Sequence, residues 1–506
     1  MPRILSLFDS DQTSQSYGVG DRYFWAWGLI DFGNATFQGC THGFARLWGA
    51  GLWPYESNEA SFIKRIHSLF LGAKFLTRID GSLEEAFPNE GSYCVTALVA
   101  YDLLVTIDLL SEEISDSLKQ EFIEIVRPLI TYLKKRDETH AIISNHLATA
   151  VAALVRWDIL IDDPVAFKKA NFLLERLLNN QSEEGWFREY EGADPGYQTL
   201  CLHYLADVNL QRRDLNLTEP ISKSIRFLHY FVHPDGSFGG YYGSRCTKFY
   251  YPSGILAMAE EIPEAAVLAK FMLHSIADHR VVGLSSMDEP NLTPMFNSYA
   301  WCAALAGQDI LSNDKINSVI LPCERKDPFQ KKFEEAGLLI DRGTDYYSII
   351  NYKKGGVVYH FVKKKLSDID NGIVIRSPKG ILGSNHFYDR NQNVSIEDDC
   401  IKIRHRISAM PKNLTSPLNF LLLRILCCTI FRISFVRELF KRFMVKYLIT
   451  SPKLWSIWNE RKIVLGEDLK VTDYPHLRKG FEKVDIKDPF VPIHMASQGY
   501  WQINGK

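Results

Sequence analysis

A turn that recurs about every fifty residues constrains this chain more than any other feature of its sequence. It has the forms Asp80-Gly81-Ser82, Glu184-Gly185-Trp186 and Asp235-Gly236-Ser237, with a looser form at Val282-Gly283-Leu284. Successive glycines are 104, 51 and 47 residues apart, so one unit near residue 133 lacks the glycine. A unit of this length holds two helices of ordinary length and two loops. The repeat therefore predicts an array of helical hairpins.

The segments between the turns have the apolar spacing of helices. Residues 93–110 are almost entirely apolar, which is typical of a helix buried on both sides, whereas residues 117–134 carry one apolar stripe. Further helices are expected at 61–75, 145–161, 167–178, 197–208 and 221–232. Buried helices that alternate with amphipathic ones suit two concentric rings. We therefore expect an (α/α) toroid of helical hairpins over residues 1–325.

After Arg325 the pattern changes to that of strands. Residues 401–407 alternate clearly, and strands are also expected at 345–351, 356–362 and 372–375. We expect a second domain over residues 326–506, an antiparallel β-sandwich stacked on one end of the toroid. The predicted fold class is thus mainly α with a C-terminal β domain.

One segment of this second part departs from the strand pattern. Residues 417–450 are strongly apolar, yet they contain six basic residues and one acidic residue. No stretch of eighteen residues is free of charge, which does not suit a membrane-spanning helix. We expect a helical insertion that either packs on the toroid with its basic residues in water or lies on an anionic membrane surface.

The overall composition excludes several classes of protein. The net charge is −2, so no nucleic-acid partner is expected. The nine cysteines are scattered and form no CxxC pair; no disulfide framework, metal site or cofactor is indicated. The short apolar stretch at the N-terminus is broken by Asp9 and Asp11, which does not suit a signal peptide. We expect a cytoplasmic protein, peripheral to the inner membrane if residues 417–450 bind lipid.

The repeat also predicts which side chains share one rim, the end of the toroid where the inner helices begin. Tyr93, Tyr197, Lys248 and Met295 stand twelve positions after the turn glycines, and Asn145-His146 occupies this position in the unit without a glycine. His146 and Tyr197 are 51 residues apart, which is one repeat. They should therefore extend from adjacent hairpins into the same cavity.

Two passages at this rim carry a resemblance to a known family. Ser144-Asn145-His146-Leu147 stands at a predicted helix start, and residues 185–199 lead from a turn glycine to the next helix start at Tyr197. An Asn-His pair, a glycine turn and a Tyr in this order resemble the heparinase II/III-like and alginate lyase group of polysaccharide lyases. Residues 235–252 look like a further rim loop of the same kind. The resemblance implies a toroid with a C-terminal β-sandwich that cleaves an acidic polysaccharide or oligosaccharide beside a uronic acid.

The resemblance implies catalytic roles for Asn145, His146 and Tyr197. In β-elimination, a base removes the proton α to the uronate carboxylate, donors polarise that carboxylate, and an acid protonates the leaving glycosidic oxygen. Asn145 would be the donor and His146 the base, while Tyr197 would be the acid, or both acid and base beside a cation. Arg245 is added because of the position of its rim loop. The other substrate-binding candidates come from the same rim and its loops: Tyr93, Trp186, Arg188, Glu189 and Tyr242.

Each assignment has a structural alternative. Asn145 suits a helix N-cap, His146 and Tyr197 suit the core, and Arg245 suits a solvated or ion-paired loop. Four aromatic residues near the N-terminus either line a sugar subsite or close the core: Tyr23, Phe24, Trp25 and Trp27.

The toroid is also compatible with other functions. Glycoside hydrolysis needs two carboxylates, for which Glu90, Glu189, Glu191 and Asp194 are available. Uronate epimerisation shares the proton abstraction but omits elimination. Outside catalysis, the alternative is a non-catalytic glycan-binding protein of polysaccharide biosynthesis.

Overall fold

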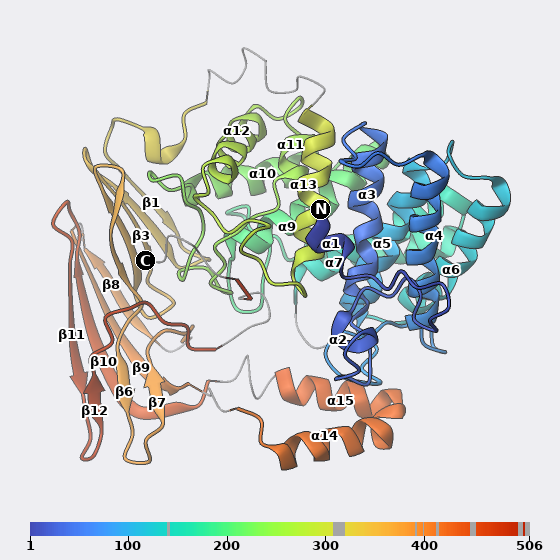
Figure 1. Ribbon diagram of the computed structural model, residues 1–506. Helices are drawn as coiled ribbons and strands as arrows, with labels where there is room; N and C mark the ends of the chain where they lie inside the picture. The colour runs from blue at the N-terminus through green and yellow to red at the C-terminus, as the bar shows by residue number, and fades with distance from the viewer. Residues whose placement is uncertain are drawn as a thin grey trace.

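A computed structural model shows a helical part followed by a β part (Figure 1). It describes residues 1–138, 142–306, 319–389, 392–397, 399–410, 414–445, 452–493 and 499–500. The α-helices of the first part are α1 (Pro2–Leu5), α2 (Arg22–Trp25), α3 (Cys40–Gly49), α4 (Glu59–Leu76), α5 (Tyr93–Leu109), α6 (Asp116–Lys135), α7 (Ser144–Ile161), α8 (Pro164–Leu178), α9 (Pro195–Gln211), α10 (Thr218–Leu228), α11 (Ser253–Ala257), α12 (Pro263–Ala277) and α13 (Leu292–Ala306).

The helices form a closed double ring. In the inner ring, α3, α5, α7, α9, α11 and α13 each contact the next, and α13 contacts α3 to close the circle. The other helices, α4, α6, α8, α10 and α12, lie outside this ring. Helix α5 is buried along almost its whole length, as its apolar sequence predicts, whereas α6 buries one stripe. The predicted toroid is confirmed.

The recurring turn owes its glycine to two constraints. Gly81, Gly185 and Gly236 have φ values of 83°, 100° and 88°, a region that other residues rarely adopt. A Cβ at Gly81 would also lie 2.2 Å from the carbonyl oxygen of Pro128 in α6, and one at Gly185 would lie 2.3 Å from that of Lys223 in α10. Each of these two turns thus packs on the outer helix of the next hairpin.

The β part contains two antiparallel sheets. The first has the order β1-β2-β3-β4-β5, and the second has the order β11-β10-β9-β7-β6-β12, with β8 paired to β9. The strands are β1 (Phe329–Phe333), β2 (Leu338–Arg342), β3 (Tyr346–Asn351), β4 (Val357–Val362), β5 (Lys365–Asp370), β6 (Val374–Arg376), β7 (Leu382–Ser384), β8 (Asn393–Glu397), β9 (Cys400–Ala409), β10 (Leu454–Val464), β11 (Lys470–His476) and β12 (Glu482–Val484).

The first sheet lies between the toroid and the second sheet. Because side chains alternate across a strand, Ile349 of β3 joins the core of the toroid while Ile350 packs with Ile401 of β9 and Ile463 of β10. The expected β-sandwich on the toroid is therefore confirmed. The division at residue 325 stays a prediction, since this sheet shares a core with the toroid.

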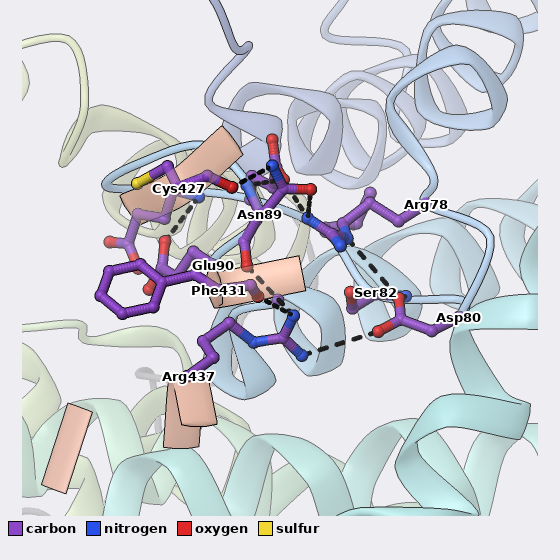
Figure 2. A network of polar contacts seen from close by, with 12 residues as sticks. Arg78, Asp80, Ser82, Asn89, Glu90, Cys427, Phe431 and Arg437 are labelled. Carbon is purple, nitrogen blue, oxygen red and sulfur yellow. Dashed lines mark hydrogen bonds and ion pairs between the residues drawn. The ribbon is translucent and has the colours of Figure 1, made fainter. Parts of the chain in front are cut away.

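The apolar basic segment forms two helices, α14 (Pro417–Cys428) and α15 (Ser434–Val445), which lie against the edge of the toroid (Figure 1). Residues 446–450 fall outside the described residues. In α15, Arg437 is buried and contacts Asp80 and the carbonyl of Asn89 (Figure 2). The expectation that the basic residues of this segment lie in water is thus wrong for Arg437. In the described part of the chain, no helix is both long enough and apolar enough to span a membrane.

Candidate active site

Asn145 and Glu189 form the centre of the candidate site. The backbone N–H and the Nδ2 of Asn145 both donate to Oε1 of Glu189, at 3.1 and 2.8 Å. The N-cap position of α7 belongs to Ile143, and Asn145 lies inside the helix, so the N-cap interpretation of Asn145 is wrong. Both side chains are buried. Because Glu189 accepts one N–H of the Asn145 amide, it fixes the orientation of this amide, and the second N–H of Asn145 is directed toward another acceptor.

Arg245 connects this pair to Tyr197. Its Nη1 lies 3.6 Å from Oε2 of Glu189, and its guanidinium carbon lies 3.7 Å from the centroid of the Tyr197 ring. The Tyr190 ring is 5.3 Å away. Burial acts to lower the pKa of Arg245, but the neighbouring Tyr197, Tyr190 and Glu189 outweigh it and raise that pKa. The guanidinium is therefore a fixed positive charge between two phenols and a carboxylate.

Burial has the largest effect on the pKa of Glu189. Desolvation raises the pKa of Glu189, although Arg245 and the hydrogen bonds from Asn145 act in the opposite direction. Glu189 reaches Asn145 because residues 187–192 fold back at the turn, and Ser144 also donates its N–H and Oγ to the carbonyl of Arg188. The loop from one hairpin is thus joined to the helix start of its neighbour.

His146 forms a second polar pair with Glu138. Its Nδ1 lies 2.8 Å from Oε2 of Glu138, and the two side chains are 17% and 2% exposed. Opposite an ionised Glu138, which can only accept, a neutral His146 has its hydrogen on Nδ1 and its lone pair on Nε2. Tyr93 begins α5 nearby, and its buried hydroxyl has no hydrogen-bond partner among the described residues. Burial raises the pKa of Tyr93, and the charges of Asp137 and Glu138 add to this effect.

The β-sandwich supports the loop that carries Arg245. Nζ of the buried Lys354 donates to the carbonyls of Tyr241 and Gly243, at 2.9 and 2.6 Å, and Nδ2 of Asn351 donates to the carbonyl of Tyr242. On the other side of the loop, Asp194 accepts from the backbone N–H of Arg245 at 2.8 Å. The position of the guanidinium therefore depends on both parts of the chain.

Comparisons with known proteins give similar folds and no family. No protein-family model matches the chain, and no curated protein matches its sequence. Among solved structures, a xanthan lyase of Paenibacillus is 10% identical with a TM-score of 0.48, over 81% of this chain and 44% of that chain. Heparinase III is 10% identical with a TM-score of 0.44, over 94% and 79% of the two chains.

A cellobiose 2-epimerase from Bacillus thermoamylovorans is also similar. It is 9% identical with a TM-score of 0.45, over 61% of this chain and 96% of that chain. This chain spans less than half of the xanthan lyase chain. Because one type of fold hosts several reactions, the reaction has to be inferred from the residues of the site.

Three of the predicted substrate-binding residues are not part of the network that Asn145, Glu189, Arg245 and Tyr197 form. Tyr242 is fully buried, and its hydroxyl bonds to Nε2 of His233 at 2.8 Å, so it belongs to the core. The indole of Trp186 donates to Glu184, whose carboxylate also accepts from two backbone N–H groups of the β1–β2 turn. Arg188 is half-buried and donates to the carbonyl of Tyr190, which makes it a support of the Glu189 loop.

Two acidic residues of the site are not among the predicted residues. Glu138 orients His146, and Glu85 lies on the loop before α5 with an exposed side chain. The surrounding protein and the charge of Glu90 raise the pKa of Glu85 to about 7, while Lys441 and Arg245 oppose this shift. The repeat contains a signal for Glu85, since Glu85 and Glu189 both stand four positions after a turn glycine.

Within the described residues, no group of three or more His, Cys, Asp and Glu side chains is arranged to hold a metal ion.

Proposed function

We propose that the protein cleaves a uronic-acid-containing polysaccharide by β-elimination at the rim of the toroid. The observation that carries this proposal is the stacking of Arg245 on Tyr197 next to the Asn145–Glu189 pair. A fixed cation, an amide donor and a phenol within one buried network are the groups that this reaction needs.

The first requirement of the reaction is to make the α proton removable. While the uronate carboxylate is fully charged, this proton is very weakly acidic. Asn145 has a second N–H beyond the one that Glu189 accepts, and Arg245 provides a positive charge beside it. Both can act on the substrate carboxylate and stabilise the charge that develops on it when the proton leaves.

The second requirement is a base and an acid. Glu138 holds His146 with Nε2 as the basic atom, so His146 takes the proton from the α carbon. The bond between the β carbon and the glycosidic oxygen then breaks, a double bond forms between the α and β carbons, and Tyr197 protonates the leaving oxygen. Arg245 stabilises the phenolate that remains on Tyr197.

The test is ultraviolet absorbance during incubation with a panel of uronate-containing polysaccharides. The new double bond is conjugated to the carboxylate, so the product absorbs where the substrate does not. We expect a rising signal that is lost in His146→Ala and Tyr197→Phe and kept in Tyr204→Phe, a buried tyrosine of the same helix α9. A flat signal on every polymer that binds, with no new chain ends, would contradict the proposal and favour a non-catalytic glycan-binding protein.

Glycoside hydrolysis is the second candidate, because Glu85 is an exposed carboxyl with a pKa raised to about 7, as a general acid requires. Three of the four carboxylates expected from the sequence suit this reaction less. Glu189 is engaged with Asn145 and Arg245, Asp194 caps α9, and Glu90 accepts from two backbone N–H groups and pairs with Lys441. New reducing ends without ultraviolet absorbance, lost in Glu85→Gln, would favour hydrolysis.

A further inference from the structure

The helices α14 and α15 have their apolar faces outward. On α14, four of the five exposed large apolar residues follow helical spacing along one face: Leu418, Leu421, Leu422 and Ile425; the fifth is Phe420. On α15 they are Phe435, Leu439 and Phe443. A surface helix of a globular protein has the opposite arrangement, with apolar residues toward the core. Exposed apolar surface of this extent marks a site of interaction.

Three basic residues of the same helices point toward the toroid. Arg437 contacts Asp80 and the carbonyl of Asn89, as Figure 2 shows. Lys441 pairs with Glu90 at 3.3 Å, and Arg424 pairs with Asp31 at 3.1 Å. These ion pairs fix the helices on the toroid with their apolar faces away from it.

The sandwich does not need this pair of helices. β9 and β10 are antiparallel neighbours in one sheet, and such strands are ordinarily joined by a loop of about two to five residues. Here the connection covers residues 410–453 and extends as far as the toroid. The pair is therefore an addition with a role outside the folding of the sandwich.

Further exposed apolar residues stand beside this pair. Arg424 also lies over the ring of Phe32, which places the loop after α2 against α14. This loop exposes Trp27 and Leu29, and α2 itself exposes Tyr23. Ile79, next to the Asp80 that binds Arg437, is fully exposed. Trp and Tyr are enriched where a protein meets the boundary between water and lipid.

We propose that α14 and α15 bind the surface of an anionic membrane. Between and beside the apolar side chains, Arg432 and Arg442 are exposed, while Glu438, the one acidic residue of 414–445, lies next to Arg437. Apolar residues that enter the lipid and arginines at the level of the headgroups are the features of an interfacial helix. The charge of this surface thus favours a bilayer with anionic lipids over an apolar groove in a protein.

Binding by this face would place the rim beside the bilayer. Glu85 lies within electrostatic range of both Lys441 of α15 and Arg245 of the candidate site. If the proposed function holds, the glycan that reaches the site is one held at the membrane. The membrane proposal itself needs no turnover, so it is tested without substrate.

The experiment is flotation of the full-length protein with two kinds of vesicle, phosphatidylcholine alone and phosphatidylcholine mixed with phosphatidylglycerol. We expect the protein to float with the mixed vesicles and less with the neutral ones. Replacing Arg432 and Arg442 by Gln should weaken partitioning to the mixed vesicles by about fivefold for each charge removed.

The variant Phe435→Glu with Leu439→Glu should stay in solution. Its matched control is Val165→Glu with Phe172→Glu, because this pair is also exposed and apolar but lies on the outer helix α8. The control should float like the unmodified protein. Leu421→Ser with Leu422→Ser probes the same face from α14 if the glutamates unfold α15.

Two results would overturn the proposal. In the first, the unmodified protein stays in solution with both kinds of vesicle. In the second, light scattering shows a dimer that Phe435→Glu with Leu439→Glu separates, and flotation does not occur, so the face joins two copies of the chain. Neither result bears on β-elimination, which is measured separately by absorbance.

Discussion

The guanidinium carbon of Arg245 lies 3.7 Å from the centroid of the Tyr197 ring. Tyr197 lies in the first turn of α9, and Arg245 lies in the loop that follows about one repeat later. Asp194, which caps α9, also accepts from the backbone N–H of Arg245. The stacking is therefore set by the backbone as well as by the side chains.

Replacing Arg245 by Gln should lower kcat by about 10²- to 10³-fold, because it removes the fixed charge that stabilises the phenolate of Tyr197 and the substrate carboxylate. The pH at which activity falls should shift upward, because Tyr197, the acid, keeps its proton to a higher pH without the positive charge beside it. Arg245→Lys keeps the charge but loses planar stacking, and it should recover part of the rate. The control is Arg226→Gln on the outer helix α10. A kcat unchanged in Arg245→Gln would remove Arg245 from the mechanism.

Replacing Glu138 should change kcat more than KM, because Glu138 positions His146 and is itself buried. Glu138→Gln keeps an oxygen that accepts from Nδ1 but removes the charge that stabilises the imidazolium. We expect a loss of about tenfold to a hundredfold, smaller than the loss of about 10²- to 10⁴-fold expected for His146→Ala. An increase in KM with kcat intact would instead indicate that Glu138 contributes to substrate binding.

The toroid could be predicted from the sequence because its helices are specified locally. Helix α5 begins one residue after Ser92, whose side chain accepts from Val95, and the expected segment 93–110 differs from it by one residue. The turn glycines are fixed by positive φ and by contact with the next outer helix. Signals of this kind depend on a few neighbouring residues, so a single sequence shows them.

The sandwich could be predicted only in part. β3, β4, β6 and β9 overlap the expected strands, whereas the remaining strands were not anticipated. β11 has an alternating pattern of exposure, but its side chains include Lys470, Thr472 and Asp473, so its sequence lacks a clear apolar face. The place of β11 in the sheet is set by its pairing with β10. The local sequence pattern of β11 carries no information on this pairing.

The site shows the same limit. The repeat places Asn145 and Tyr197 on one rim, and in the structure Glu189 and Arg245 connect them, whereas Tyr242 belongs to the core. Loops have no period, so the sequence does not show which side chains of residues 240–246 face the Asn145–Glu189 pair. The catalytic roles of the site residues stay predictions.

Lys354 offers a test of the contact between the sandwich and the site. Its ammonium group is buried and donates to the carbonyls of Tyr241 and Gly243. Lys354→Met leaves both carbonyls without this donor, so we expect a loss of about 1–3 kcal/mol in the free energy of unfolding, measured by urea denaturation. Lys353→Met changes a neighbouring lysine that binds the exposed carbonyls of Glu334 and Glu335, and it should cost less. Equal losses in the two variants would show that Lys354 does not hold the Arg245 loop.

Glu85 should make stability depend on pH between about 4.5 and 7. Below pH 4.5 the carboxyl is protonated in both the folded and the unfolded chain. As the pH rises from 4.5, the unfolded chain releases this proton, while the folded chain holds it until the pKa of about 7 because of desolvation by the surrounding protein and the charge of Glu90. Folding therefore loses stability across this window, and the loss levels off above pH 7.

Glu85→Gln has no proton to release, so it should escape this loss. The Tm of the variant should equal that of the unmodified protein near pH 4 and exceed it increasingly up to pH 7, as measured by thermal unfolding in a series of buffers. Glu183→Gln, which changes an exposed residue of another turn, should show no such trend. If the difference in Tm between Glu85→Gln and the unmodified protein is constant across the series, Glu85 ionises in the folded protein as it does in water. Its proposed role as a general acid in hydrolysis then loses its support.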